Sequence, residues 1–358
     1  MRGFAIAGRP VQAARAAVHV AIAYSIVVPL FDCRDAGTRA LQSALDQTFS
    51  RTRYEVVAVV DACADSRAMQ PLLMRCDRVV AVDADFGCVE TEIALFDAGR
   101  RVARGDFLFF IEGHTVLETD ALRAIDDALV GNPGCELACG GRSNHAKTRL
   151  GMLIGSNNDL HEARAEQRGN FTLGANCVIR RSLLESLGGF VTAFQRFNET
   201  VVYDRAREAG VRIGTIGATL CTHHNDTGLR WLVRLLVATG RAKARYYATL
   251  PRKVRAARAR HPAYRWLSSR PLAMAFALPL RVAGPLTIVV AIALARRWFA
   301  AAAAVYRIGV GLTDLSGACL ECAKGGCAAA RRRDIDAMRN FAAPGTGPSV
   351  LDVMKRTA

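Results

Sequence analysis

The side chains best suited to chemistry follow a short apolar run at residues 107–111 (FLFFI). Glu112 and His114 come directly after this run and are separated by Gly113. Two residues apart on an extended chain, their side chains point to the same side. A carboxylate and an imidazole so placed can hold one divalent cation, and the imidazole tilts the choice from Mg²⁺ toward Mn²⁺. Without further context, however, Glu-Gly-His after a strand is more often a turn.

A second group of candidates lies in the C-terminal half of the chain. Glu199 begins a helical pattern, and Asn198 before it is the predicted N-cap. The helix dipole favours an acidic residue in the first turn and keeps the carboxylate ionised, as a general base requires. His223 and His224 follow a strand predicted over residues 212–219, and one of them is expected to complete the metal site.

These candidates follow apolar runs that alternate with helical patterns. Strands are predicted over residues 24–30 (YSIVVPL), 54–60 (YEVVAVV), 78–82 (RVVAV) and 107–111, the first three buried, and helices over residues 38–47 and 90–104. Strands separated by helices predict right-handed crossovers and a mostly parallel sheet. Ligands of such sheets bind beyond the carboxyl ends of the strands, and Asp61 and Glu112 each follow a strand end.

The first half of this pattern resembles the family 2 glycosyltransferases with the GT-A fold. Residues 25–31 (SIVVPLF) and 54–61 (YEVVAVVD) are similar to the opening strands of the family. A glycine-containing segment with Gly87 and Gly99, and then residues 103–106 (ARGD), follow in the family's order. Next, Glu-x-His at 112–114 takes the place of the family's metal-binding D-x-D.

The resemblance continues to about Asp226. Residues 174–181 (GANCVIRR) and 187–190 (LGGF) resemble the acceptor-side segment of the family. The E-D motif that supplies the catalytic base falls on residues 198–199 (NE), and a later histidine of the family matches His223 or His224. The ordered set covers some 200 residues, although no single motif decides the matter.

The resemblance implies an α/β fold of the GT-A type, with a mostly parallel sheet flanked by helices. It implies transfer of a sugar from a nucleotide sugar, with a UDP-sugar favoured, to a saccharide or lipid-linked acceptor, with inversion and with Mn²⁺ or Mg²⁺. The implied residues are Pro29, Phe31, Asp61, Gly87 and Glu112 for the nucleotide sugar; Gly174, Asn176 and Arg180 on the acceptor side; Glu199 as the base; and Glu112, His114, His223 and His224 for the metal.

Departures from the family pattern leave two alternatives open. Besides the Glu-x-His and Asn-Glu variants, residues 62–64 (ACA) replace the usual Asp-Gly-Ser after the second strand. A non-catalytic relative could act as the membrane-bound partner of an active enzyme. An α/β nucleotidyltransferase is the other alternative, but residues 31–37 (FDCRDAG) do not supply its G-x-G-T-R-like loop.

The formal net charge of +16 is confined to one segment. Sixteen basic residues and no acidic residue lie between Asp226 and Asp314, and the remaining 32 basic residues equal the 32 acidic residues. These arginines are mixed with Leu, Val and Ala, which favours an anionic membrane surface and not nucleic acid.

Aromatic and apolar residues of the same segment support this expectation. Trp231, Tyr246, Tyr247 and Trp266 suit a headgroup belt. Residues 271–295 are apolar apart from Arg281 and contain Pro279 and Pro285; the 14 residues after Arg281 are short of the ~20 needed to span a bilayer. The alternative is a soluble helical domain packed on the sheet.

The 358 residues are therefore divided into four predicted parts. These are an N-terminal extension (1–23), a GT-A domain (24–227), basic and apolar membrane-associated helices (228–312) and a polar tail (313–358). An apolar content of 51% excludes disorder. Eleven cysteines without framework spacing predict free thiols in a reducing compartment, at the cytoplasmic side of the inner or plasma membrane. Zinc binding by Cys319, Cys322 and Cys327 is the disfavoured alternative.

Overall fold

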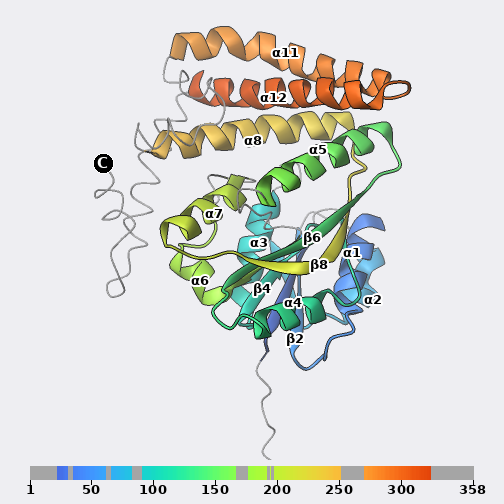
Figure 1. The fold of residues 1–358 in the computed structure, drawn as a ribbon, viewed down its shortest axis with the longest axis vertical. Helices are drawn as coiled ribbons and strands as arrows, with labels where there is room; N and C mark the ends of the chain where they lie inside the picture. Colours follow the sequence, from blue (N-terminus) through green and yellow to red (C-terminus); the bar gives the residue numbers. More distant parts are fainter. Residues whose placement is uncertain are drawn as a thin grey trace, which may run out of the picture.

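The computed structural model describes residues 22–30, 35–61, 66–82, 91–166, 176–191, 194, 197–250 and 270–323. Within them, a mixed sheet of eight strands has the order β3-β2-β1-β4-β7-β6-β8-β5 (Figure 1). The strands are β1 (Tyr24–Leu30), β2 (Tyr54–Asp61), β3 (Arg78–Val82), β4 (Phe107–Phe110), β5 (Thr115–Leu117), β6 (Leu137–His145), β7 (Cys177–Arg180) and β8 (Gly214–His224). Strands β3, β2, β1 and β4 are parallel, as are β6 and β8. The predicted fold class, an α/β protein with a mostly parallel sheet, is confirmed.

Helices cover both faces of this sheet. They are α1 (Asp35–Leu45), α2 (Gln70–Leu73) after a 3₁₀ turn (Arg67–Met69), α3 (Thr91–Val102), α4 (Ala121–Val130), α5 (Arg149–Glu166), α6 (Arg181–Ser186), α7 (Asn198–Glu208), α8 (Leu229–Thr249), α11 (Arg270–Leu294) and α12 (Phe299–Ala323). Ile26 and Val28 of β1 belong to the core shared with α1 and α4, whereas Val27 belongs to the core shared with α3 and α6. This alternation explains why β1 reads as an unbroken apolar run.

Three sequence predictions about elements need correction. Strand β3 lies at the sheet edge and its residues alternate between half-buried and exposed, so it is not a fully buried strand. Strand β8 runs to His224 and not to residue 219, which places both histidines inside the strand. The N-cap of α7 is Phe197, and the side chain of Asn198, instead of capping α7, is hydrogen-bonded to the backbone N and O of Val191, at 2.7 and 2.8 Å.

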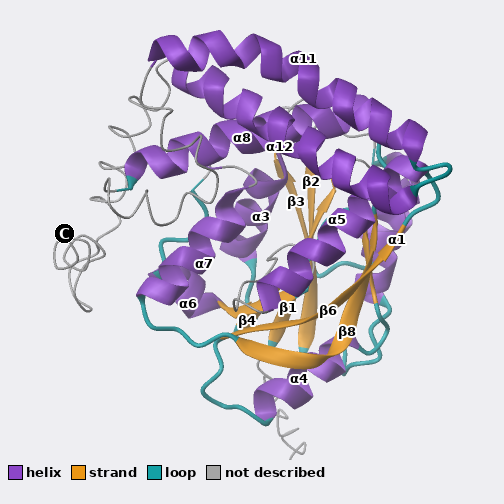
Figure 2. Cartoon of the chain, turned by 45° about the horizontal axis from the view of Figure 1, so that its top comes forward, coloured by secondary structure: helices purple, strands orange, loops and turns teal. Residues whose placement is uncertain are grey.

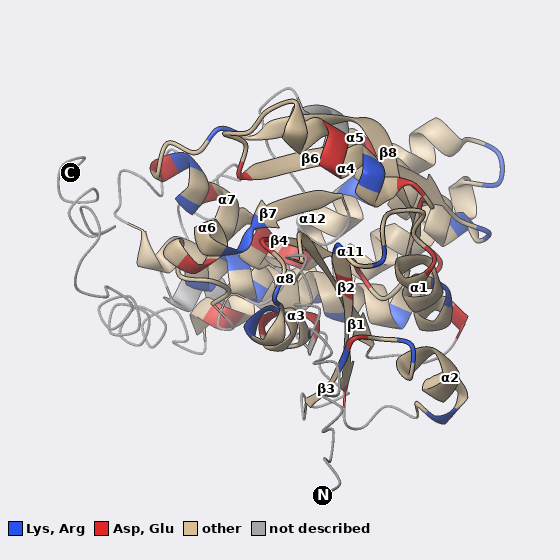
Figure 3. Cartoon of the chain, turned by 90° about the horizontal axis from the view of Figure 1, so that it is seen from below, with Lys and Arg blue, Asp and Glu red and all other residues tan. Residues whose placement is uncertain are grey.

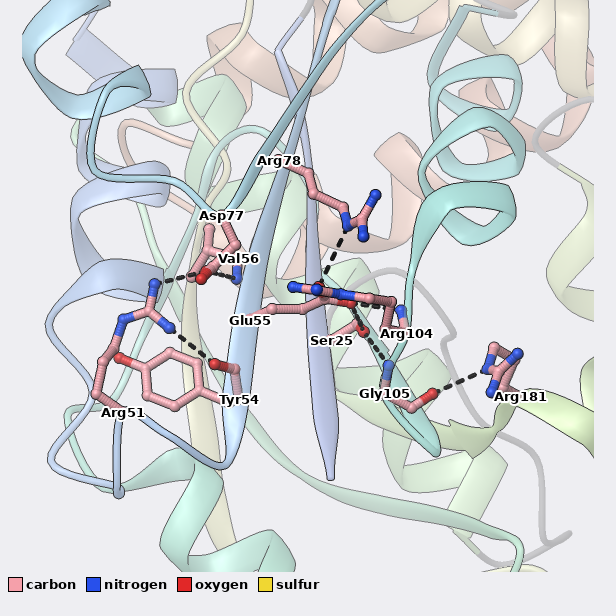
Figure 4. A network of polar contacts seen from close by, with 10 residues as sticks. All are labelled: Ser25, Arg51, Tyr54, Glu55, Val56, Asp77, Arg78, Arg104, Gly105 and Arg181. Carbon is pink, nitrogen blue, oxygen red and sulfur yellow. Dashed lines mark hydrogen bonds and ion pairs between the residues drawn. The ribbon is translucent and has the colours of Figure 1, made fainter. Parts of the chain in front are cut away.

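The A-R-G-D segment closes the amino-terminal end of the parallel strands. Its Gly105 donates its backbone N–H to Ser25 Oγ at 2.8 Å, and Ser25 Oγ donates to the buried carboxylate of Glu55 at 2.6 Å (Figure 4). A Cβ at Gly105 would come within 2.5 Å of the Ser25 backbone N. Arg104 also binds Glu55, through Nε at 2.9 Å. This motif is therefore structural and lies at the end of the sheet opposite to the candidate site.

The C-terminal helices form a separate layer. Helices α8, α12 and α11 lie one beyond the other on the side of the sheet that α5 covers (Figures 1 and 2). Glycines allow close approach: a Cβ at Gly317 would lie 2.0 Å from the Val237 carbonyl oxygen of α8, and one at Gly284 would lie 2.3 Å from Thr313 Oγ1. Residues 313–323, predicted to start a polar tail, instead complete α12.

The acidic residues of α12 pair with basic residues of α8. Lys243 Nζ donates to Asp314 Oδ2 at 2.7 Å, and Arg241 and Arg245 donate to the Glu321 carboxylate at 2.9 and 2.8 Å. Three of the sixteen basic residues therefore form ion pairs inside the helical layer. Over the sheet and its covering helices, basic and acidic residues are interspersed (Figure 3), and residues 24–226 contain 22 basic and 27 acidic residues.

Candidate functional site

Glu112, His114 and His223 meet at the carboxyl end of β4. The Ile111 N–H donates to the Val27 carbonyl oxygen at 3.1 Å, so Glu112 is the first residue beyond the parallel ladder. The chain then turns into β5, which pairs antiparallel with β8 and aligns Thr115 with His223. This register brings the two histidines together, 109 residues apart in the sequence.

The three donor atoms of this group form a small triangle. His223 Nε2 lies 2.7 Å from Glu112 Oε2 and 2.9 Å from His114 Nε2, and the third side, from His114 Nε2 to Glu112 Oε2, is 3.5 Å. Ligand atoms held at about 2.0–2.2 Å from one ion lie about 3 Å apart, so this triangle fits a divalent cation. Among the described residues, it is the one His/Cys/Asp/Glu group with such spacing.

Burial adds a second indication of a cation. Glu112 is 4% exposed and His223 is 7% exposed. A positive charge stabilises a buried carboxylate, and a cation bound between Glu112 and the two imidazole nitrogens would supply one. One carboxylate oxygen and two imidazole nitrogens are a donor set suited to Mn²⁺ or another transition metal ion, in agreement with the sequence prediction.

His224 does not join the group, which corrects its assignment as a metal ligand. Successive residues of β8 point to opposite faces of the sheet. The ring of His224 therefore packs against His145 of β6, with centroids 5.1 Å apart. Burial lowers the pKa of His224, and the charge of Arg39 lowers it further.

Of the residues predicted to bind the nucleotide sugar, Pro29, Asp61 and Glu112 lie in the described part of the chain. Asp61 ends β2 and is fully buried, and Pro29 lies inside β1 opposite Val59. Because β2, β1 and β4 are parallel neighbours, Asp61 and Glu112 lie at the same end of the sheet, about 12 Å apart across two strand spacings and a stagger of two residues. Phe31 and Gly87 lie outside the described residues, and so does Gly174 of the acceptor side.

Asn176 and Arg180 lie at opposite ends of β7, and so at opposite ends of the sheet strands. Strand β7 is antiparallel to β4 and pairs Val178 with Phe109, so Asn176, before β7, adjoins the edge that carries Glu112. The Asn176 side chain is buried; Nδ2 donates to the Gly140 carbonyl oxygen at 2.8 Å, and Oδ1 has no hydrogen-bond partner within the described residues. Arg180 stacks on the Phe107 ring, 4.5 Å from its centroid, at the far edge. This position does not support an acceptor-side role for Arg180.

Glu199 is half-buried in the first turn of α7. Its charge reaches Cys177, the first residue of β7: burial raises the pKa of the Cys177 thiol well above its ordinary value, and Cys139 and Glu199 raise it further.

A polar layer behind His223 was missed at the level of sequence. Asn225 lies two residues after His223, is 3% exposed, and places Oδ1 2.8 Å from His223 Nδ1. An asparagine directly after a His-His pair is a weak signal, since its partners come from elsewhere in the chain. A cleft of about 340 Å³ lies beside this layer, lined by Asn144, His145, Ala146, Gly151, Met152, Gly155, Ser156, Asp159, Asn225 and Phe299.

Cys319 and Cys322 are buried in the apolar contact between α8, α11 and α12. Burial raises the pKa of Cys319 and so disfavours the thiolate that zinc binding needs. Cys327 lies outside the described residues.

Comparison with known proteins gives structural similarity only. No protein-family model and no curated protein matches the sequence. Among solved structures, S. aureus TarS 1–349 in complex with UDP is similar with a TM-score of 0.46 and 13% identity, over 81% of this chain and 90% of that one. The complex with UDP-GlcNAc gives 0.43 and 13%, over 81% and 91%. A longer TarS structure gives 0.41 and 14%, and this chain covers 39% of it. At this level the likeness concerns the course of the chain, and the chemistry rests on the residues described above.

Proposed function

We propose that the protein is a metal-dependent glycosyltransferase that moves a sugar from a nucleotide-sugar donor to a saccharide or lipid-linked acceptor. The observation that carries the proposal is the convergence of Glu112, His114 and His223 at the carboxyl edge of a parallel sheet. This is the edge where α/β sheets bind ligands. The ordered family motifs of the sequence fit the same activity, and a UDP-sugar is the favoured donor.

In the proposed reaction Glu112, His114 and His223 would hold a divalent cation, which would supply positive charge to the donor's diphosphate. When bound, the ion would offset the negative charge that develops on the leaving diphosphate as the glycosidic bond breaks. Asp61, at the end of β2, accepts a hydrogen bond from the nucleotide base. Its distance from Glu112, about 12 Å across two strands, suits a ligand with a base at one end and a diphosphate at the other.

Glu199 is the proposed general base. It would take the proton of an acceptor hydroxyl as that oxygen attacks the anomeric carbon from the face opposite the leaving diphosphate, which inverts the configuration. Its position in the first turn of α7 favours the ionised carboxylate. The buried Asn176 Oδ1, at the end of the sheet that carries Glu112, can accept a hydrogen bond from the same acceptor.

Nucleotide binding tests the proposed site without knowledge of the donor sugar. UDP should bind more tightly in Mn²⁺ than in EDTA, as measured by calorimetry. His223→Ala should remove the effect of Mn²⁺, and His224→Ala, the neighbour on the opposite face of β8, should retain it. Equal UDP affinity in Mn²⁺ and EDTA for the folded wild-type protein would contradict the proposal.

We also propose that the protein works at the cytoplasmic face of a membrane, held by α11. This helix is the outermost layer of the molecule (Figure 2). Its buried residues face α12, and its opposite side exposes Leu278, Val282, Leu286, Val289 and Val290, each at least 45% exposed. Such a one-sided apolar stripe is typical of helices that lie in a membrane surface.

Arginines and aromatic residues surround this apolar stripe. Arg281 is exposed within it, and exposed Arg296 and Arg297 stand at its end, followed by Trp298. Arginine suits anionic headgroups, and tryptophan suits the boundary between headgroups and acyl chains. By length and composition, α11 is the one described helix that could also cross a bilayer, with a mean hydropathy of 2.0 over Phe276–Leu294.

A further inference from the structure

We infer that Asp159, Asn144 and Asn225 form a chain of hydrogen bonds that fixes the proton of His223 on Nδ1 and thereby leaves Nε2 turned to a cation. The three are positioning residues and do not themselves touch the ion. The inference rests on the proposed metal centre, but it assigns new residues to it, from β6, from α5 and from the segment after β8.

The direction of the chain is set at its outer end. Asn144 Nδ2 donates to Asp159 Oδ1 at 2.5 Å. An ionised carboxylate can only accept hydrogen bonds, so the amide group that faces it must be the NH₂. The carbonyl oxygen of the Asn144 side chain is therefore turned inward, toward Asn225.

The same logic passes to Asn225. Its Nδ2 donates to Asn144 Oδ1 at 2.9 Å and makes a longer contact, 3.3 Å, with the His223 carbonyl oxygen. Both of these partners can only accept, so the NH₂ orientation is fixed twice. The Oδ1 atom of Asn225 accepts from Asn158 Nδ2 at 2.9 Å and lies 2.8 Å from His223 Nδ1.

An acceptor at 2.8 Å requires that His223 Nδ1 carry a proton. When the neutral ring binds an ion, Nε2 then offers its lone pair, and this atom faces Glu112 Oε2 and His114 Nε2 at 2.7 and 2.9 Å. In the metal-free protein the Glu112 carboxylate can only accept, so it competes with Asn225 Oδ1 for the proton of His223. Imidazole ligands of metal ions are commonly held in this way by a hydrogen bond to the second nitrogen. Without the chain, the proton could move to Nε2, where it would block the metal-binding position.

The packing of α5 against β6 and β8 supports this arrangement. Asn144 and His223 are paired residues of the parallel strands β6 and β8, so the chain crosses the sheet at the level of the metal centre. Helix α5 comes close at Gly155. A Cβ there would lie in ordinary van der Waals contact, at 3.4 Å, with both Asn144 Cβ and Asn225 Nδ2, so a side chain longer than alanine would press on both residues.

The position of the His223 proton can be measured directly in metal-free protein labelled with ¹⁵N-histidine. The protein contains seven histidines. Long-range ¹H–¹⁵N spectra distinguish a protonated from a bare Nδ1. We expect a protonated Nδ1 for His223 in the wild type and a shift toward the Nε2–H form in Asn225→Ala. A bare Nδ1 in the wild type would overturn the inference.

Mn²⁺ affinity, measured from the free-ion signal in electron paramagnetic resonance, is the second readout. Loss of such a supporting group typically weakens metal binding by about 10–100-fold, which we expect for Asn225→Ala. Asn225→Asp keeps an acceptor beside Nδ1 and should recover most of the affinity. Asp159→Asn, at an exposed position, should weaken binding less but in the same direction.

The matched control is Ser143→Ala. It removes a 2.7 Å hydrogen bond to Thr222, the residue that pairs with Ser143 between β6 and β8. Neither residue belongs to the chain of hydrogen bonds that reaches His223. It should bind Mn²⁺ like the wild type, and wild-type affinity in Asn225→Ala would overturn the inference. If the wild type binds no Mn²⁺, the proposed function fails while the spectra still decide the proton position. If Asn225→Ala does not fold, Asp159→Asn replaces it in both measurements.

Discussion

Three side chains carry most of the functional information. Glu112 and His223 are nearly fully buried although both are polar, and with His114 they present their donor atoms to a common point. Two other predicted site residues make contacts away from this point: His224 packs on His145, and Arg180 stacks on Phe107. The distinction follows from alternation along strands and from which end of a strand each residue occupies.

Glu199→Gln tests the proposed base. The amide keeps the size of the side chain but cannot accept a proton, so transfer to an acceptor should fall by about 10²–10⁴-fold. Donor binding, measured by calorimetry with UDP and Mn²⁺, should be unchanged, because the proposed nucleotide contacts lie at Asp61 and Glu112. Near-normal transfer by this variant would show that Glu199 is only a favourable charge at the start of α7.

Packing between elements is most constrained in the helical layer. A Cβ at Gly240 of α8 would lie 1.7 Å from the Asp314 carbonyl oxygen, so Gly240→Ala must separate α8 from α12. We expect the free energy of unfolding to fall by about 1–3 kcal/mol or more, measured by urea denaturation. Gly311→Ala in α12 is the control, because nothing lies within 4 Å of its Cβ position. It should raise stability by about 0.5–1 kcal/mol, and equal effects of the two substitutions would contradict this packing.

The ion pairs between α8 and α12 predict a dependence of stability on pH. Burial alone would raise the pKa of Glu321, but hydrogen bonds and charges from Arg245 and Arg241 outweigh it and hold the pKa below its ordinary value of about 4.5. A carboxyl whose pKa is lower in the folded state contributes stability above its unfolded pKa and loses this contribution as the pH falls through the folded pKa.

Glu321→Gln should therefore be less stable than the wild type at about pH 6, and the difference should shrink on acidification below about pH 4. Urea denaturation across this range measures it. Glu185→Gln, which alters an exposed pair with Arg181 at 3.9 Å, should change stability little at either pH. A pH-independent difference for Glu321→Gln would mean that its charge does not contribute to the packing of α12.

The sequence predicts the parallel strands of the sheet and two residues of the proposed metal site, Glu112 and His114. It does not predict which of His223 and His224 joins them, or the residues behind His223. Buried parallel strands read as continuous apolar runs, so β1, β2 and β4 were found, with Glu112 and His114 directly after β4. The choice of His223 over His224 depends on the register between β5 and β8, which no local pattern encodes. Asn225 was missed because its partners, Asn144 and Asn158, are 81 and 67 residues away.

The molecule as a whole combines a slightly acidic α/β layer, with 22 basic and 27 acidic residues over 24–226, with a basic, apolar helical layer. The sequence assigned all sixteen basic residues of the segment to a membrane surface, but Arg241, Lys243 and Arg245 are paired with α12. Tyr246 is also buried, with its hydroxyl donating to Asp204 at 2.6 Å. The proposed membrane surface is therefore smaller than the charge count suggested and centres on α11.

Flotation with anionic phosphatidylglycerol vesicles tests this surface. The full chain should float with the vesicles and remain bound in high salt, because apolar burial is not screened. The double substitution Val282→Asp and Leu286→Asp should release it, and Met74→Asp, at an exposed apolar residue on the α/β layer, should not. A chain that stays soluble and unbound without detergent would show that α11 has another partner.

The central claim is that Glu112, His114 and His223 form the cation centre of a nucleotide-sugar transferase. Turnover tests it most directly: purified protein, Mn²⁺, a panel of nucleotide sugars, and detection of the released nucleoside diphosphate with and without candidate acceptors. We expect release from one donor, its loss in EDTA, its recovery with Mn²⁺, and its absence in His114→Ala and His223→Ala. Full release in EDTA, or release of the same size from the histidine variants, would contradict the claim.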